Sequence, residues 1–222
     1  MKNKKFNILT SILITSLIST LPVHAGVTDL FDGFRSNSSL VDKYSSRVQS
    51  DIKAVSSSSD KTVEKVKTAS EVLESIIQES NLDKTKYNNF KSKVDTAVSE
   101  KEYLDSQVNQ LADDVNKYTQ ALTERANEIK NPKYKDMAMK KINTVKSRLK
   151  PKIDSVKSAS KQIDPYIQEL KDILALIQID FSTQAIKGKE DLANKLKGDF
   201  VALKQKTNAL KIEGDKIISE MK

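Results

Sequence analysis

Residues 87–129 read YNNFKSKVDTAVSEKEYLDSQVNQLADDVNKYTQALTERANEI, and this stretch decides the fold. Its spacing alternates between 3 and 4 along one seam: Tyr87, Phe90, Val94, Ala97, Lys101, Leu104, Val108, Leu111, Val115, Tyr118, Leu122, Arg125 and Ile129. Only Lys101 and Arg125 are polar on this seam. Six heptads in one register predict a long helix that buries the seam against another helix, as in a coiled coil.

The sequence on both sides repeats this pattern. An earlier helix is predicted through Val41, Tyr44, Val48, Ile52, Val55, Val66, Ala69, Leu73 and Ile76, and a later region through Ile142, Val145, Leu149, Val156, Ile163, Ile167, Leu170, Leu174 and Ile177. The last run is Ala193, Leu196, Phe200, Leu203, Thr207, Leu210, Gly214, Ile217 and Met221, in which Thr207 and Gly214 are poor packing residues. The serines at 56–59 mark a place for a bend or a break, and Pro151 predicts a kink or a break.

Turns are expected at residues 81–83, at Asn131-Pro132 and at residues 182–188, and Asp164-Pro165 reads as an N-cap followed by proline at the first helical position. Short connections between helices force neighbours to run antiparallel. The sequence therefore predicts an all-α fold, an elongated antiparallel helical bundle or coiled coil of three to four long helices. Residues 38–222 form its single domain, preceded by a short apolar segment at 26–37.

The first 25 residues have the pattern of a secretory signal peptide. Lys2, Lys4 and Lys5 precede an apolar stretch at 8–21, and small residues lead to cleavage after Ala25; retention as an uncleaved anchor is the alternative. Removing these three lysines lowers the net charge from +8 to +5. The new N-terminus carries Val27, Leu30, Phe31 and Phe34, a cluster that either docks on the rod or contacts a membrane or partner.

Residues 26–222 contain no His, Cys or Trp, because the single histidine is His24. This composition excludes histidine-based and thiol nucleophiles, His and Cys zinc ligands, and a lipid-modified cysteine. Carboxylates are the remaining catalytic candidates, namely Glu100, Glu102, Asp105, Asp113 and Asp114, but neighbours one or two apart on a helix point in different directions. Tyr87, Tyr103, Tyr118, Tyr134 and Tyr166 read as core packing or single exposed rings. We expect neither an enzyme nor a cofactor, and no nucleic-acid partner.

Charge is segregated along the chain. Residues 95–128 hold eight acids against three bases, whereas residues 130–152 hold nine bases against Asp136. One interpretation is that an antiparallel hairpin lays the basic stretch against the acidic helix and neutralises it. The other is that lysines at the end of the rod contact an anionic membrane or polymer surface. These candidate contact residues are Lys130, Lys133, Lys135, Lys140 and Lys141.

Two stretches resemble a family of uncharacterised Gram-negative envelope proteins that carries only a domain-of-unknown-function label. They are Leu40-Val41-Asp42-Lys43-Tyr44, and Ile163-Asp164-Pro165-Tyr166-Ile167 with Leu170-Lys171-Asp172 and Gln184-Ala185-Ile186. The resemblance covers residues 38–220. It implies an exported coiled-coil protein of the envelope and brings no catalytic residues; many members carry a lipid-modified cysteine that this sequence lacks.

Together these features predict an exported, non-enzymatic helical scaffold, spacer or binding protein of the bacterial cell envelope, with the periplasm as its location. Its partner is a protein or an envelope surface, with peripheral contact to an anionic membrane as one form. The alternative is a secreted or surface-exposed effector or adhesin that binds host or neighbouring-cell surfaces. A carboxylate hydrolase would need acids that converge in a pocket, and a slender rod offers few pockets.

Overall fold

The computed structural model describes residues 38–189 and 192–220. Within these ranges the chain forms five α-helices, one short 3₁₀ turn and no strand. They are α2 (Ser38–Gln78), α3 (Lys84–Asn127), α4 (Pro132–Lys161), α5 (Asp164–Ile179), the 3₁₀ turn η1 (Thr183–Ile186) and α6 (Leu192–Glu220). The predicted all-α class is confirmed. The signal peptide, the cleavage after Ala25 and the segment at 26–37 lie outside the described residues.

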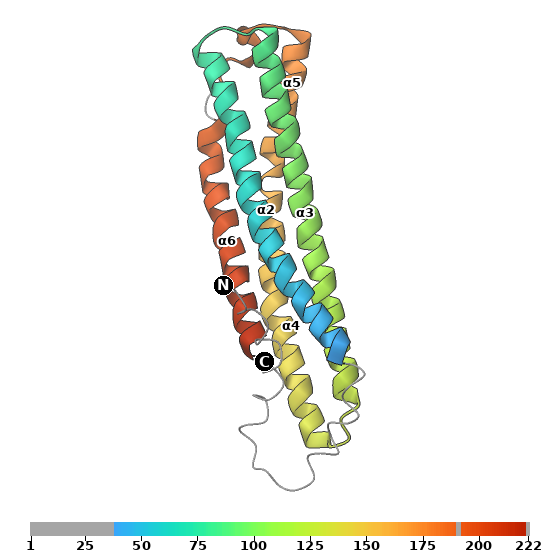
Figure 1. Cartoon of the computed structure of the whole chain (residues 1–222). Helices are drawn as coiled ribbons and strands as arrows, with labels where there is room; N and C mark the ends of the chain where they lie inside the picture. The colour runs from blue at the N-terminus through green and yellow to red at the C-terminus, as the bar shows by residue number, and fades with distance from the viewer. Residues whose placement is uncertain (1–37, 190–191, 221–222) are drawn as a thin grey trace, which may run out of the picture.

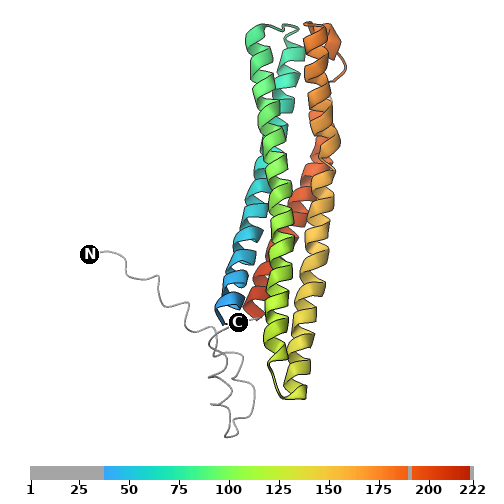
Figure 2. The same ribbon diagram turned by 90° about the vertical axis from the view of Figure 1, so that its right-hand side faces the viewer.

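The helices form an elongated antiparallel bundle (Figures 1 and 2). α2 runs to one end, α3 returns along it, α4 and α5 follow one another back in the first direction, and α6 returns again. α2 packs on α3 and α6, and α4 packs on the same two helices, so the bundle has four sides. At 1.5 Å per residue the 44 residues of α3 span about 66 Å.

One continuous apolar core runs along the bundle axis, and the predicted seams supply it. The α3 seam is buried from Phe90 to Tyr118, while its outer positions at residues 87, 122, 125 and 129 are half-buried. The predicted positions of α4 and α5 are all buried, and so are those of α6 from Phe200 to Ile217. The heptad pattern therefore identified the core face correctly at these positions, while the predicted seam residues Ala193, Leu196 and Met221 lie outside the described side chains.

Two predicted turns owe their positions to local capping. Asp83 precedes α3 and its side chain accepts a hydrogen bond of 2.8 Å from the backbone N–H of Lys86. Asn131 precedes α4 in the same way, and Pro132 occupies the start of the helix. Each cap satisfies an N–H group that the helix itself leaves without a partner, so the chain reverses where the sequence predicts.

The breaks predicted as one alternative at residues 56–59 and at Pro151 do not occur, and a third local prediction changes. The serines at 56–59 do not interrupt α2, because Ser58 and Ser59 are buried against neighbouring helices and Thr207 Oγ1 donates to Ser59 Oγ at 3.2 Å. Pro151 lies inside α4 without breaking it. A proline in a helix costs about 3 kcal/mol, and burial of apolar neighbours on the same helix offsets that cost.

The third change concerns the start of α5. A new helix begins there as predicted, but Ile163 occupies the cap position and makes no side-chain cap. Asp164 is instead the first helical residue, and its Oδ1 lies 2.6 Å from Nζ of Lys101 on α3. The Asp164 carboxylate, which the sequence predicts as a helix cap, instead holds α5 against α3 through its ion pair with Lys101.

Candidate functional site

The hairpin between α3 and α4 projects beyond the other described helices at one end of the bundle (Figures 1 and 2). The hydroxyl of Tyr118 on α3 hydrogen-bonds Ser45 on α2. Because the two helices run antiparallel, Ser38, two turns before Ser45, lies level with residue 125, two turns after Tyr118. Arg148 pairs with Glu213, so the end of α6 at residue 220 lies level with residue 141 of α4. In the described part of the chain, residues 125–141 therefore pack mainly on each other; we call them the hairpin tip.

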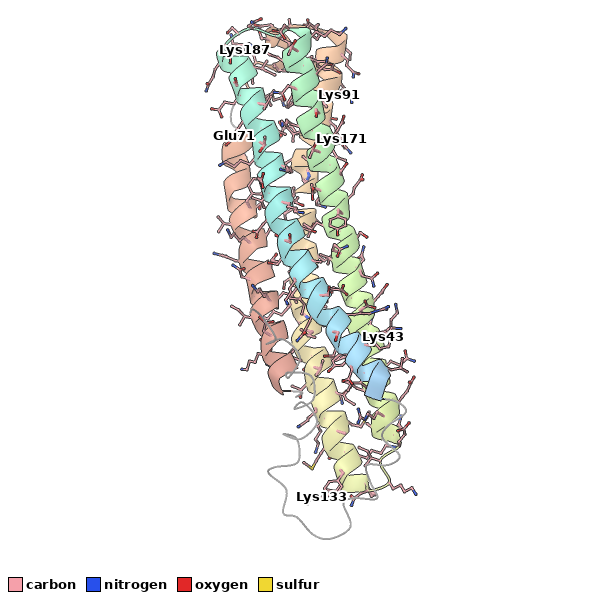
Figure 3. The ribbon with its side chains drawn as sticks, viewed as in Figure 1. Lys43, Glu71, Lys91, Lys133, Lys171 and Lys187 are labelled. Atoms are coloured by element: carbon pink, nitrogen blue, oxygen red, sulfur yellow. The ribbon has the colours of Figure 1, made fainter. Side chains whose placement is uncertain are left out.

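The predicted contact lysines all lie in the hairpin tip, and Figure 3 shows Lys133 at its end. Lys130, Lys133, Lys140 and Lys141 are exposed, and Lys135 is half-buried. Lys140 pairs with Asp136 on its own helix at 2.8 Å. Within the described ranges, no salt bridge joins any of the five to a carboxylate of α3. The first interpretation, mutual neutralisation of the two stretches, therefore finds no direct pair at these lysines.

Two apolar side chains stand among these lysines. The sequence alone predicts for Tyr134 only core packing or a single exposed ring, and it indicates no role for Met137. Tyr134 is 43% exposed and Met137 is 45% exposed. They are one turn apart on α4. Tyr134 lies about three full turns before the buried Val145 and so projects in nearly the same direction, which means that its exposure comes from its place near the end of the bundle. The signal in the sequence was an apolar i, i+3 pair flanked by lysines, which is easily missed because it does not repeat.

The candidate carboxylates of α3 do not converge. Asp105 accepts hydrogen bonds from Lys101 Nζ at 2.7 Å and from Ser160 at 2.8 Å, and Lys101 also reaches Asp164. Lys101 has only 5% of its side chain exposed, and its ammonium group joins α3 to the α4–α5 junction. Glu102 and Asp113 are exposed, and Glu100 is half-buried. This cluster fixes how the helices meet.

A second buried polar group lies between α2 and α3. Asp114 is 2% exposed and accepts a hydrogen bond from Gln110 at 2.9 Å, while Lys117 lies 3.6 Å away. Burial, the hydrogen bond with Asp114 and the charge of Asp114 raise the pKa of Asp51 to about 6, against the opposing charge of Arg47. Asp51 Oδ2 and Asp114 Oδ1 are both buried without a donor in the described chain. Below a pH of about 6, the proton on Asp51 supplies one.

Two hollows on the described surface are open grooves. One of about 440 Å³ is lined only by polar side chains of α3, including Lys91, Asp95 and Glu100. Another of about 370 Å³ lies between α3 and α5 and is lined by Val98 of α3 and by Lys171, Ala175 and Gln178 of α5, among others. Among the residues that the structure describes, no group of three or more His, Cys, Asp or Glu side chains could hold a metal ion. The grooves present helix surface and no convergent set of reactive groups.

The far end of the bundle carries a different surface. Leu176, Ile179 and Phe181 are exposed there, with Ile179 at 84%. The ring of Phe181 meets that of Tyr87 edge to face at 5.8 Å, and Gln178 donates to the Tyr87 hydroxyl at 2.8 Å. In the described residues, no helix is both long enough and apolar enough to span a membrane.

A family model described as "Protein of unknown function (DUF2959)" matches residues 40–221. The match covers most of the chain and nearly the whole of the bundle. No curated protein and no solved structure matches the chain.

Proposed function

The chain belongs to the DUF2959 family, whose function is unknown, and from this premise and the shape of the bundle we propose a mechanical or binding role without catalysis. The protein is an exported helical scaffold, spacer or binding protein of the bacterial cell envelope, located in the periplasm. The observation that carries the proposal is the rod itself: a closed core about 66 Å long whose two ends differ in surface chemistry.

A non-enzymatic role is supported by how the buried polar groups are used. Lys101 pairs with Asp105 on α3 and with Asp164 on α5, and Asp105 accepts a hydrogen bond from Ser160 on α4. Asp51 and Asp114 face each other between α2 and α3. Lys101 and Asp114 are buried, and these contacts hold neighbouring helices in register.

Export is supported by residues 1–25, where lysines, an apolar stretch and small residues before position 26 follow one another in the order of a signal peptide. The Gram-negative envelope is supported by the resemblance of residues 40–44 and 163–172 to an envelope family. The lysines of the hairpin tip are the proposed contact with an anionic envelope surface.

The test is fractionation of native cells into medium, periplasm and membranes, a high-salt wash of the membranes, and the mass of the recovered protein. We expect a periplasmic or salt-released protein whose mass corresponds to a start at residue 26. Ala25→Lys is the matched control, because it places a long side chain where signal peptidase needs a small one and should leave the full-length mass.

Two outcomes would overturn the proposal. Accumulation of the protein in the medium or on the outer surface replaces the scaffold with the alternative, a secreted or surface-exposed effector or adhesin that binds other cells. Recovery of the full-length chain from the cytoplasm refutes export, and with it any role in the envelope.

A further inference from the structure

The hairpin tip combines exposed apolar and cationic side chains on the first turns of one helix. Tyr134 and Met137 are 43% and 45% exposed, and they lie between Lys133 and Lys141 along α4. The backbone N–H of Tyr134 is bound by the Asn131 cap at 3.4 Å, which fixes the start of the helix. A capped helix start holds both apolar side chains on a defined outer surface, where nothing in the described chain covers them fully.

The charge of the tip is strongly one-sided. Residues 125–141 contain six bases and two acids, a net charge of +4. One of the acids, Asp136, is already paired with Lys140. The far end provides the comparison, since residues 78–91 and 172–189 hold five bases and four acids around the exposed Leu176, Ile179 and Phe181. Both ends expose apolar side chains, but the net charge is +4 at the tip and only +1 at the far end.

We propose that the hairpin tip docks end-on to an anionic lipid bilayer, with Tyr134 and Met137 entering the interfacial layer and the surrounding lysines binding lipid phosphates. This inference rests on the proposed function, because it names the surface that the tip contacts. Tyrosine suits the interfacial layer because its ring is apolar and its hydroxyl stays hydrated, and lysines beside it are attracted by the negative surface potential.

The apolar pair favours a bilayer over a soluble or wall-bound polyanion. A polyanion would satisfy Lys130, Lys133 and Lys141 by charge alone and would leave Tyr134 and Met137 in water. The tip also extends along the bundle axis in both views, so docking there stands the rod away from the surface (Figures 1 and 2). The bulk of the bundle then remains free for another contact.

The absence of tryptophan provides a direct test. Three variants each place a single tryptophan at one level of the rod: Tyr134→Trp at the tip, Tyr103→Trp on the exposed side of α3, and Phe181→Trp at the far end. The two control sites are each 51% exposed, close to Tyr134. All three proteins are purified from cells with their N-terminus established by mass, so any contribution from residues before 38 is the same in each.

The fluorescence of each variant is measured with vesicles of equimolar phosphatidylcholine and phosphatidylglycerol, and with pure phosphatidylcholine. We expect the emission of the Tyr134→Trp protein to shift to shorter wavelength only with the anionic vesicles, and to be quenched by brominated acyl chains. The Tyr103→Trp and Phe181→Trp proteins should keep their emission. The paired change Lys133→Gln with Lys141→Gln should weaken partition about 25-fold, because each lysine near an anionic surface is worth about fivefold.

The matched charge control is Lys204→Gln with Lys206→Gln on α6, which removes two exposed lysines away from the tip and should change partition little. Vesicle binding without an emission shift in the Tyr134→Trp protein overturns insertion, while leaving charge-mediated contact intact. A shift in the Phe181→Trp protein instead assigns docking to the far end. No binding to anionic vesicles, with binding to a soluble polyanion such as polyphosphate, replaces the bilayer with a polymer. Each result is separate from the fractionation that tests export.

Discussion

Gly214 marks the closest approach of α6 to α2, and the substitution Gly214→Ala measures how tightly the bundle closes there. A Cβ at residue 214 would lie 2.3 Å from Cδ1 of Ile52, while the next Ile52 atoms are at ordinary distances of 3.5 and 3.8 Å. Helix propensity alone would stabilise the protein by about 1 kcal/mol. Ile52 is 2% exposed, so its Cδ1 would have to shift within the packed core, and overpacking should cost about 1–3 kcal/mol. We expect a net loss of about 1 kcal/mol.

The clash involves a single atom, so Ile52→Val should relieve it. Alone, Ile52→Val removes Cδ1 from the core and should cost about 1 kcal/mol. In the double variant the methyl group introduced at residue 214 occupies the space that Cδ1 leaves, while the helix keeps its gain in propensity. Additive behaviour would give a loss of about 2 kcal/mol. The geometry instead predicts a double variant close to the parent, which is a coupling of about 2 kcal/mol.

The assay is urea unfolding monitored by circular dichroism. The parent, the two single variants and the double variant are compared with a common dependence of unfolding free energy on urea concentration. Gly198→Ala is the control on the same helix, because nothing lies within 4 Å of a Cβ at that residue. It should stabilise the protein by up to about 1 kcal/mol. If the two single changes at 52 and 214 add without coupling, α6 does not pack on α2 as described, and the closure of the bundle is wrong.

Three further predictions concern polar groups. Because the folded chain holds the proton of Asp51 up to a pH of about 6, the free energy of unfolding should fall as pH rises from about 4 through 6. The change Asp51→Asn, whose amide can donate to Asp114, should remove that fall and stabilise the protein by about 1 kcal/mol at pH 7.5. Urea unfolding at about pH 4 and at pH 7.5 measures both effects. Lys101→Met should change stability by less than about 1 kcal/mol, whereas Lys101→Ala should cost about 2 kcal/mol because it also removes the buried methylene chain of the lysine. Equal losses in the two variants would show that the charge of Lys101 matters more than its packing. Asn131→Ala should cost about 1 kcal/mol and speed amide exchange at Lys133 and Tyr134, and unchanged exchange at these two amides would contradict the cap.

The core-facing side of the helices was predictable because apolar residues recur along the sequence in a heptad repeat. A seam that keeps its 3 and 4 spacing from Phe90 to Tyr118 has one face to bury, and the structure buries it. The turns at Asp83 and Asn131 were predictable for a local reason, since each side chain caps the helix that follows it. Neither feature depends on knowing which helix lies opposite.

Features that depend on the opposite helix were mispredicted or missed. The serines at 56–59 look helix-weakening alone, but α2 stays continuous because Thr207 of α6 bonds Ser59, and Thr62 donates to the backbone of α3 at 3.1 Å. Gly214 reads as a weak seam residue, yet it makes room for Ile52. Asp51 and Asp114 are 63 residues apart in the sequence, so no local signal predicts that their carboxyl groups meet.

The position of the candidate lysines could be predicted from the local sequence, but the exposure of the hairpin tip could not. A turn at Asn131-Pro132 within a lysine-rich stretch was enough to place the five lysines at one end of a rod. The prominence of that end follows from where α2 begins and α6 ends relative to α3 and α4, which the sequence of the hairpin does not contain. Exposure of Tyr134 and Met137 depends on that offset, because a longer α2 or α6 would provide more surface to cover them.

The offset of α2 and α6 relative to α3 and α4 also makes the two ends of the rod different. Both the first described residue of α2 and the last of α6 lie toward the hairpin tip, whereas the α2–α3 turn and η1 close the far end (Figures 1 and 2). A bilayer that binds the tip would therefore meet the end where the chain enters and leaves the bundle. It would hold the exposed Leu176, Ile179 and Phe181 away from the surface by about the length of α3, roughly 66 Å. A spacer needs two chemically distinct ends at a fixed separation, and the continuous core between them keeps that separation rigid.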